Sequence, residues 1–409
     1  MKIYGILGKK LGHTFSPLIH GMLGDYAYQV FENTPEELDG FLKGGDFAGL
    51  NVTIPYKLAV IPYCAQLSET ARQIGSVNTL VRREDGTLFG DNTDYYGLRY
   101  MVEKSGVSPA GEKAIVLGSG GASLTAQAVL RDMGAREVVT ISRSGPENYE
   151  NLYRHYDAGV IVNTTPVGMF PGNGAAPVDI SAFSDCKCLY ELIYNPARTK
   201  LMQDAERCGI QSVGGLKMLV AQAKKAAEIY LDTRIDDSRI EEIEARIERM
   251  TKNVMLIGMP GCGKTTVGRC LAGLTGRDFV DLDEEVEKTA GKTIPQIFAE
   301  QGEAAFRRLE TEVLEQFSKL SGKVIATGGG VVTRGENRDL LRQNSTVVFL
   351  NSPISALAVA GRPVSQSTPL EVLYAARMPN YLGWSDLQVE CADTEVTAKE
   401  IQNKLKLTE

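Results

Sequence analysis

Short apolar runs that predict buried strands alternate along this chain with segments of helical periodicity. The strand-like runs are KIYGILG (2–8), AGLNVTI (48–54), KAIVLGSG (113–120), EVVTISR (137–143), AGVIVNTT (158–165) and KCLYELIY (187–194). Helical patterns, such as the one over 122–133, lie between several of these runs. Because alternating strands and helices build parallel sheets covered by helices, the pattern predicts an α/β fold class.

A densely charged segment interrupts this alternation at 232–250, with the sequence DTRIDDSRIEEIEARIERM. Ile240, Ile243, Ile247 and Met250 fall at helical spacing within it. We interpret the segment as an amphipathic helix that joins two units and rests its apolar stripe on one of them. A solvated linker helix is the alternative. A new strand-and-helix pattern begins after this segment, which marks a domain boundary.

Composition narrows the class of protein. At about 150 residues per domain, a chain of 409 residues contains two or three domains. Apolar residues make up 43% and the formal net charge is −7, which with no basic tract argues against a nucleic-acid binder. No apolar run reaches the roughly 18 residues of a membrane span, and the N-terminus does not resemble a signal peptide. Seven cysteines and three histidines without metal-ligand spacing indicate reduced thiols in a cytoplasm and no zinc site.

The stretch NVMLIGMPGCGKTTVG (253–268) matches the pattern G-x-x-x-x-G-K-[ST]. A buried-strand run precedes the loop and a helical pattern follows it, which is the context that a phosphate-binding loop requires. Its glycines let backbone N–H groups turn toward the phosphates. Lys264 is placed to reach the β- and γ-phosphates, and the Thr265 hydroxyl to bind Mg²⁺.

Several features favour a small-molecule kinase over other proteins with this loop. The chain has no guanine-reading N-K-x-D, and STVVFLNSP (345–353) lacks the aspartate of a Walker-B strand. In FVDLDEEVEK (279–288), Asp281 and Asp283 alternate, so we expect them to point to one side of an extended strand end. One would hold the Mg²⁺ shell and the other would accept a proton from a hydroxyl. A helix N-cap followed by a solvated acid is the alternative.

Two further motifs follow this pair. FAEQGEAAFRRLE (298–310) places two arginines beside Phe306, a pattern also seen on exposed helices. ATGGGVV (326–332) offers three consecutive glycines, which permit a substrate to approach the backbone closely.

As an ordered set that ends in GRPV and RMPNY (377–381), these motifs resemble shikimate kinase from 253 to about 387. The resemblance implies a kinase of the P-loop NTPase fold, like nucleoside-monophosphate kinases, in which Lys264 and Asp283 are catalytic. Asp283, Arg307, Gly329 and Arg377 would bind shikimate, with the arginines on its carboxylate. Thr265 and Asp281 would bind Mg²⁺. The implied ATP-binding residues are Gly261, Cys262, Gly263, Lys264, Thr265, Thr266 and the lid residue Arg362.

The lid departs from the family pattern. The stretch between Arg362 and Arg377 is short, and the arginine expected just before it is missing from ALAVAG (356–361). This departure bears on lid closure and ATP affinity rather than on the type of reaction.

The front half carries motifs of another kind. IVLGSGGAS (115–123) follows a strand and opens a helix, as a dinucleotide-binding turn does. At the end of the next strand, ISRSG (141–145) has Arg143 where an NAD site has an acid, which favours the 2′-phosphate of NADP. A surface-loop arginine is the alternative. GLNVTIPYK (49–57) ends in Lys57, and the strand–turn–strand segment 75–97 closes with GDNTD, which contains Asp94.

These stretches, with GHTFSPLIH (12–20), NTTPVGM (163–169), YELIYNP (190–196) and GGLKMLVAQA (214–223), resemble shikimate dehydrogenase over nearly all of 1–235. The resemblance implies that Lys57 and Asp94 form the catalytic pair. The implied substrate contacts are Thr14, Ser16, Thr53, Lys57, Asn78, Asp94, Tyr194 and Gln222. The implied NADP contacts are Glu69, Gly118, Ser119, Gly120, Gly121, Ala122, Ser142, Arg143, Ser144, Leu192 and Gly215. Thr14 stands where a serine is common, and its retained hydroxyl predicts at most a modest effect on affinity.

Together the two resemblances predict a bifunctional enzyme of aromatic amino-acid biosynthesis. It would reduce 3-dehydroshikimate with NADPH and then phosphorylate shikimate with ATP and Mg²⁺, as a monomer or homodimer without nucleic-acid or membrane partners. We expect a substrate lobe (1–96 with 214–235), a Rossmann-like NADP lobe (97–213), a helical linker (236–252) and the kinase domain (253–409). Two alternatives are a quinate/shikimate dehydrogenase fused to a small-molecule kinase, and a metabolite-sensing NTP switch. Intact Lys57, Asp94 and Asp283 argue against the switch.

Overall fold

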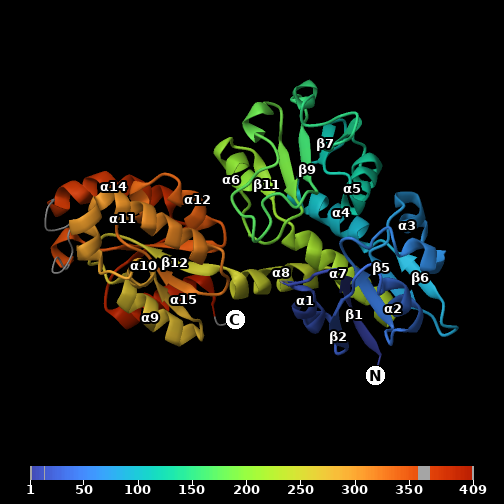
Figure 1. Ribbon diagram of the computed structural model, residues 1–409, viewed down its shortest axis with the longest axis horizontal. Coiled ribbons are helices and arrows are strands. Elements are labelled where there is room, and N and C mark those ends of the chain that lie inside the picture. The colour runs from blue at the N-terminus through green and yellow to red at the C-terminus, as the bar shows by residue number, and fades with distance from the viewer. Residues whose placement is uncertain (1, 13, 358–368, 408–409) are drawn as a thin grey trace. The chain divides into compact units, whose positions relative to one another are not determined.

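The computed structural model describes residues 2–12, 14–357 and 369–407 (Figure 1). The chain divides into two compact units, Met1–Tyr194 with Leu201–Ala245, and Asn195–Lys200 with Arg246–Glu409. The predicted strands are present with shorter bounds than the apolar runs suggest. For example, 48–54 becomes β3 (Gly49–Val52), because the chain turns just before Pro55. The predicted α/β class is therefore confirmed.

The first unit begins with a six-stranded mixed sheet in the order β2-β1-β3-β5-β6-β4. Its strands are β1 (Ile3–Gly8), β2 (Ala27–Glu32), β3, β4 (Cys64–Leu67), β5 (Thr79–Arg82) and β6 (Leu88–Asp91). Strand β1 lies parallel to both β2 and β3, whereas β3, β5 and β6 pair antiparallel. Helices α1 (Ser16–Leu23), α2 (Leu38–Gly44) and α3 (Glu69–Ile74) belong to this lobe. Thr53 and Lys57 of the first candidate site follow β3, whereas Asn78 directly precedes β5.

The second sheet of this unit is fully parallel, in the order β11-β10-β9-β7-β8. Its strands are β7 (Lys113–Leu117), β8 (Glu137–Ile141), β9 (Val160–Asn163), β10 (Cys188–Glu191) and β11 (Gln211–Val213). Ala114 and Val116 pack into one core, and Ile115 and Leu117 into another. A parallel sheet is buried on both faces, so the sequence of β7 is a continuous apolar run. Helices α4 (Thr93–Ser105), α5 (Gly121–Asp132) and α6 (Lys200–Arg207) accompany it.

Two helices follow the parallel sheet. Helix α7 (Leu216–Leu231) returns to the first lobe, where it packs against α1, α4 and β5. Helix α8 (Ser238–Thr251) is the helix expected in the charged segment, and the division between the two units falls inside it. Ile240, Ile243 and Ile247 are buried as expected. Met250 is not: it lies in the final turn at the edge of the stripe and is 47% exposed, so its assignment to the apolar stripe was wrong.

The second unit contains a five-stranded parallel sheet in the order β13-β14-β12-β15-β16. Its strands are β12 (Asn253–Ile257), β13 (Phe279–Asp281), β14 (Val324–Ala326), β15 (Ser345–Asn351) and β16 (Leu387–Glu390). In Figure 1, α9 (Lys264–Thr275) and α15 (Thr394–Leu405) lie together on one side of this sheet. The other helices are α10 (Leu282–Ala290), α11 (Ile294–Ser318), α12 (Asn337–Arg342) and α14 (Leu370–Trp384).

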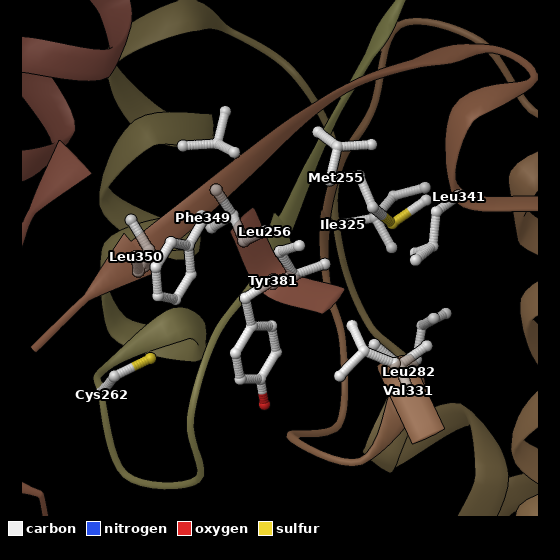
Figure 2. Packing of buried hydrophobic residues seen from close by; sticks show 14 of the residues in the cluster. Met255, Leu256, Cys262, Leu282, Ile325, Val331, Leu341, Phe349, Leu350 and Tyr381 are labelled. Carbon is white, nitrogen blue, oxygen red and sulfur yellow. The ribbon is translucent and has the colours of Figure 1, made fainter. Parts of the chain in front are cut away.

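The core of this unit surrounds the central strand β12, whose five residues are all buried. Figure 2 shows Leu256 beside Phe349 and Tyr381, with Met255 close to Ile325. The rings of Phe349 and Tyr381 stack with centroids 5.1 Å apart. This packing fixes the strand that leads directly into the phosphate-binding loop.

Candidate active sites

Lys57 and Asp94 form the centre of the first site. Lys57 follows β3 through a turn, and its carbonyl accepts a hydrogen bond from the Val77 amide at 2.9 Å. Asp94 lies in the first turn of α4, where Asn92 is the N-cap. The Lys57 Nζ lies 2.5 Å from the Asp94 Oδ2, and both side chains are largely buried. The carboxylate thereby holds the ammonium in one position, which suits a group that must donate a proton to a fixed atom.

Asn78 and Gln222 lie on either side of the start of α4. The Asn78 Oδ1 accepts from the Thr93 amide at 2.7 Å, and its Nδ2 donates to the Gln222 Oε1 at 3.4 Å. Gln222 comes from α7, so the return of the chain to the first lobe brings this side chain to the site. Both side chains are buried, and their amides can recognise hydroxyl groups of a ligand.

Thr14 and Ser16 present two hydroxyl groups at the N-terminus of α1. The Thr14 Oγ1 donates to the Ser16 Oγ at 3.1 Å. The Tyr194 ring lies 5.2 Å from Phe15, and a hydrogen bond with Thr14 partly opposes the rise that burial causes in the pKa of Tyr194. Thr53 follows β3 and lies close to Gly8. Hydroxyl groups at a helix N-terminus suit an anionic group such as a carboxylate.

The glycine-rich turn after β7 approaches Lys57 closely. Gly118 has φ +108°, a conformation that favours glycine. A Cβ at Gly121 would lie 2.9 Å from the Ser76 Oγ and 3.2 Å from the Lys57 Cβ. The turn therefore brings the start of α5 against the stem of the Lys57 side chain. The cradle formed by Gly118, Ser119, Gly120, Gly121 and Ala122 fits a dinucleotide phosphate.

The other expected NADP contacts come from several elements of the first unit. Arg143 is exposed directly after β8, next to buried Ser142 and exposed Ser144, so its guanidinium is accessible to a phosphate. Gly215 touches Leu192, since a Cβ there would lie 2.2 Å from the Leu192 carbonyl oxygen. Glu69 starts α3, which packs against α5, and its Oε1 accepts from Gln73 at 3.1 Å.

The phosphate-binding loop connects β12 to α9 in the second unit. Gly261 and Gly263 have φ +88° and +90°, so alanine would be strained at either position. The Lys264 Nζ donates to the Gly258 and Met259 carbonyls at 2.9 and 3.0 Å, which holds it within the loop. Cys262 is buried in the loop, and Thr265 and Thr266 lie in the first turn of α9. The loop and the helix N-terminus fit the phosphates of a nucleotide.

Asp281 and Asp283 lie together, but not on an extended strand end. Asp281 ends β13, and its Oδ1 accepts from the Asp283 amide at 3.0 Å as the N-cap of α10. Asp283 therefore belongs to the first turn of that helix, and the strand-end prediction was wrong for it. The Asp281 Oδ2 accepts from the Thr265 Oγ1 at 2.7 Å. This hydroxyl–carboxylate pair fits Mg²⁺, which binds proteins through few side chains together with substrate phosphates.

Asp283 has a strongly raised pKa. Burial, followed by the nearby Glu310 and Asp281 carboxylates, raises this pKa to about 7 against the opposing charges of Lys264 and Arg307. A carboxyl group with a pKa near neutrality is suited to accept a proton at the operating pH. The alternative was therefore half right: Asp281 is the N-cap of α10, but Asp283 is half-buried rather than a solvated acid.

Two arginines and a glycine segment lie beside Asp283. Arg307, on α11, donates to the Glu310 Oε2 at 2.8 Å and to Glu303 at 3.1 Å. It is 8% exposed, so the exposed-helix alternative is wrong for Arg307, whereas the neighbouring Arg308 is exposed. The Arg377 Nη1 donates to the Gly329 carbonyl at 3.0 Å. Both guanidinium groups can bind a carboxylate with two parallel hydrogen bonds.

Glu310 was not assigned a role from the sequence, although it is the last residue of the FRRLE motif. It is 1% exposed, and burial raises its pKa. A Cβ at Gly328 would lie 2.5 Å from the Glu310 Oε1 and 2.8 Å from the Asp283 Oδ1. Glu310 therefore connects Arg307, Asp283 and the glycine segment. Tyr381 adds a 2.5 Å hydrogen bond from its hydroxyl to the Gly329 carbonyl. Arg362 and the first residues of the short lid stretch, 363–368, lie outside the described residues.

The N-terminal part of the chain is similar to shikimate dehydrogenases. The family of shikimate dehydrogenase substrate binding domains matches residues 6–80. A shikimate dehydrogenase (NADP(+)) of Clostridium perfringens is 35% identical over 264 residues, which cover 59% of this chain and 97% of that protein. The crystal structure of shikimate dehydrogenase 1 from Peptoclostridium difficile is 37% identical with a TM-score of 0.57, covering 61% of this chain and 98% of that one. A Thermus thermophilus shikimate 5-dehydrogenase, solved with NADP(H) and shikimate, is 30% identical with a TM-score of 0.55, covering 60% and 99%.

The back of the chain matches a different family. The shikimate kinase family matches residues 260–406, a range that contains the loop residues from Gly261 onward and the Asp283–Arg307–Arg377 group. The range covers most of the second unit, and this family has the P-loop NTPase fold.

Proposed function

The chain belongs to the shikimate dehydrogenase family and also contains a shikimate kinase domain, and from this we propose that it performs two consecutive reactions on one small molecule. The first unit reduces 3-dehydroshikimate to shikimate, and the second phosphorylates the 3-hydroxyl of shikimate. The main support for this proposal is that the two sites have the same arrangement. Each places a proton-transfer group, Lys57 or Asp283, beside side chains that can bind a carboxylate.

In the dehydrogenase site, separate residues bind the cofactor, hold the substrate and transfer the proton. NADPH, when bound at the glycine turn, supplies the hydride. Thr14, Ser16 and Tyr194 hold the substrate carboxylate, while Asn78 and Gln222 contact its hydroxyls. Lys57 stabilises the negative charge that develops on the ketone oxygen and donates a proton to it. Asp94 holds the Lys57 ammonium in a fixed position.

The kinase site works mainly by positioning and charge. ATP supplies the phosphoryl group, and Mg²⁺, held near Thr265 and Asp281, neutralises charge on the phosphates. Arg307 and Arg377 hold the shikimate carboxylate, so that its hydroxyl faces Asp283. Asp283 accepts the hydroxyl proton, and Lys264 stabilises the charge on the transferring group.

We also propose the domain boundaries, the cellular location and the oligomeric state. We place the domain boundaries at 1–96 with 214–235, 97–213, 236–252 and 253–409, and we propose a cytoplasmic monomer or homodimer without nucleic-acid or membrane partners. Every described helix is too short or too polar to cross a bilayer. All seven cysteines are free thiols.

Two separate assays test the two activities. Loss of NADPH absorbance with 3-dehydroshikimate tests the first unit, and release of ADP with shikimate tests the second. The alternative substrate is tested by running the dehydrogenase in reverse with NADP⁺ and either shikimate or quinate. Faster oxidation of quinate would identify quinate, rather than shikimate, as the substrate of the first unit. Absence of turnover in both units would favour the metabolite-sensing switch protein.

A further inference from the structure

A buried asparagine, Asn92, joins three segments of the dehydrogenase site. It is the N-cap of α4, and its Oδ1 accepts a hydrogen bond from the Tyr95 amide at 3.2 Å. It is 3% exposed and belongs to neither the substrate nor the nucleotide contacts identified above. Capping uses only the oxygen of the Asn92 side chain, so both of its amide protons are free to bond other segments.

The two amide protons of Asn92 bond two different segments. Its Nδ2 donates to the Ser76 carbonyl at 2.9 Å and to the Thr125 Oγ1 at 3.3 Å. These partners fix the orientation of the side-chain amide, because a carbonyl only accepts and the Tyr95 N–H only donates. Thr125 is fully buried and donates its own proton to the Gly121 carbonyl at 3.2 Å. Each hydrogen bond in this chain therefore has its own proton.

The Ser76 contact connects Asn92 to the segment that holds Lys57. Ser76 directly precedes Val77, whose amide donates to the Lys57 carbonyl at 2.9 Å. Asp94, the partner of Lys57, lies two residues after Asn92 in the first turn of α4. Asn92 is therefore connected through short segments to both members of the proposed catalytic pair.

The Thr125 contact connects Asn92 to the glycine-rich turn. Thr125 and Gly121 lie one turn apart on α5, and Gly121 is the first residue of that helix. At Gly121 the turn comes closest to Lys57, since a Cβ there would lie 3.2 Å from the Lys57 Cβ. A helix N-terminus of this kind binds the phosphates of a dinucleotide. The position of α5 therefore decides where a nicotinamide lies relative to Lys57.

From these contacts we propose that Asn92 is a positioning residue for hydride transfer. Its side chain ties the start of α5, and with it the bound nucleotide, to the segments that carry Lys57 and Asp94. The hydride donor and the proton donor then keep one relative position, and the rate of the chemical step depends steeply on that position. The inference rests on the proposed function of the first unit.

Asn92→Ser separates this bridging role from helix capping. Serine caps a helix about as well as asparagine, but it cannot supply the two protons that the amide donates. We expect the single-turnover rate of NADPH oxidation, measured by stopped flow with both ligands saturating, to fall about ten- to hundredfold. The Kd for NADPH, measured by calorimetry, and the KM for 3-dehydroshikimate should stay within about threefold of the wild-type values, because Asn92 holds neither ligand.

Thr125→Val and Thr125→Ser form a matched pair. Valine keeps the branched shape of the side chain and removes the hydroxyl, whereas serine keeps the hydroxyl and removes one methyl group. We expect Thr125→Val to slow the same single-turnover step about three- to tenfold, which is the size of effect that one neutral hydrogen bond produces. The effect is smaller than that of Asn92→Ser because the bond to Ser76 remains. Thr125→Ser should stay within about twofold of the wild type.

The outcomes separate the inference from the proposed function. A wild-type protein that does not oxidise NADPH with 3-dehydroshikimate would refute the function itself. An active wild-type protein with an unchanged single-turnover rate in Asn92→Ser would overturn only the positioning role. That role is also overturned if Thr125→Ser is as slow as Thr125→Val, because packing would then be the cause, or if NADPH binding weakens as much as the rate falls. If Asn92→Ser fails to fold, the Thr125 pair decides by the same criteria.

Discussion

At the scale of single residues, we propose that the reduction depends on the Lys57 side chain. It is the only ammonium group contacting Asp94 among the described ion pairs. Lys57→Ala should lower dehydrogenase kcat by about 100-fold or more, since general-acid groups contribute on that order. Kinase turnover of the same variant should remain near that of the wild type. The reciprocal control is Lys264→Ala, which should abolish phosphoryl transfer alone. Equal losses of both activities in either variant would contradict independent sites.

The raised pKa of Asp283 predicts that kinase activity falls as the pH is lowered. Because its pKa is raised to about 7, the carboxyl holds a proton below this pH and cannot accept another. The kinase kcat/KM should therefore fall about tenfold for each pH unit below 7 and level off above it. Asp283→Asn should lower turnover strongly while ATP binding, measured by calorimetry, persists. Unchanged turnover in this variant would remove Asp283 from the mechanism.

Residues in local motifs could be located from the sequence, whereas those defined by long-range contacts could not. Lys57, Asp94 and Asp283 each stand in a short, recognisable stretch. Glu310 becomes notable only when the fold brings Gly328 against it. No local pattern of apolar and polar residues contains such contacts.

At the scale of elements, the glycine segment between β14 and α12 is a close-packed wall of the kinase site. A Cβ at Gly330 would lie 2.0 Å from the Arg307 Nη1, although φ of −99° permits alanine. Gly330→Ala should displace the guanidinium and raise the KM for shikimate at least about tenfold, since a bidentate charged contact is lost. The KM for ATP should change little.

Gly335→Ala is the matched control for this segment. Gly335 lies on the same connection, and a Cβ there would meet nothing within 4 Å. Its kinetics should match the wild type. A similar KM for shikimate in both variants would show that Arg307 is not held against the glycine segment in the way described.

The apolar pattern predicted the type of most elements but not their ends. It located β7 and α5 within a few residues, because a buried run and a helical stripe are both local signals. It failed at Asp283, since the alternation D-x-D fits a strand end and a helix N-cap equally well. The hydrogen bond from the Asp283 amide to Asp281 decided in favour of the helix.

At the scale of the whole molecule, the chain joins a producer of shikimate to a consumer of it. The two units have separate cores and separate sheets, and each contains one set of the proposed catalytic side chains. This organisation makes each activity separable by mutation. Both units must therefore bind shikimate, the first as its product and the second as its substrate.

A coupled assay of the purified chain tests this claim most directly. The protein is given 3-dehydroshikimate, NADPH, ATP and Mg²⁺, and products are followed by mass spectrometry together with NADPH absorbance. We predict that one NADPH is oxidised and one ADP formed for each shikimate 3-phosphate that accumulates. Shikimate that accumulates without phosphorylation, or ATP consumption without NADPH oxidation, would contradict the account.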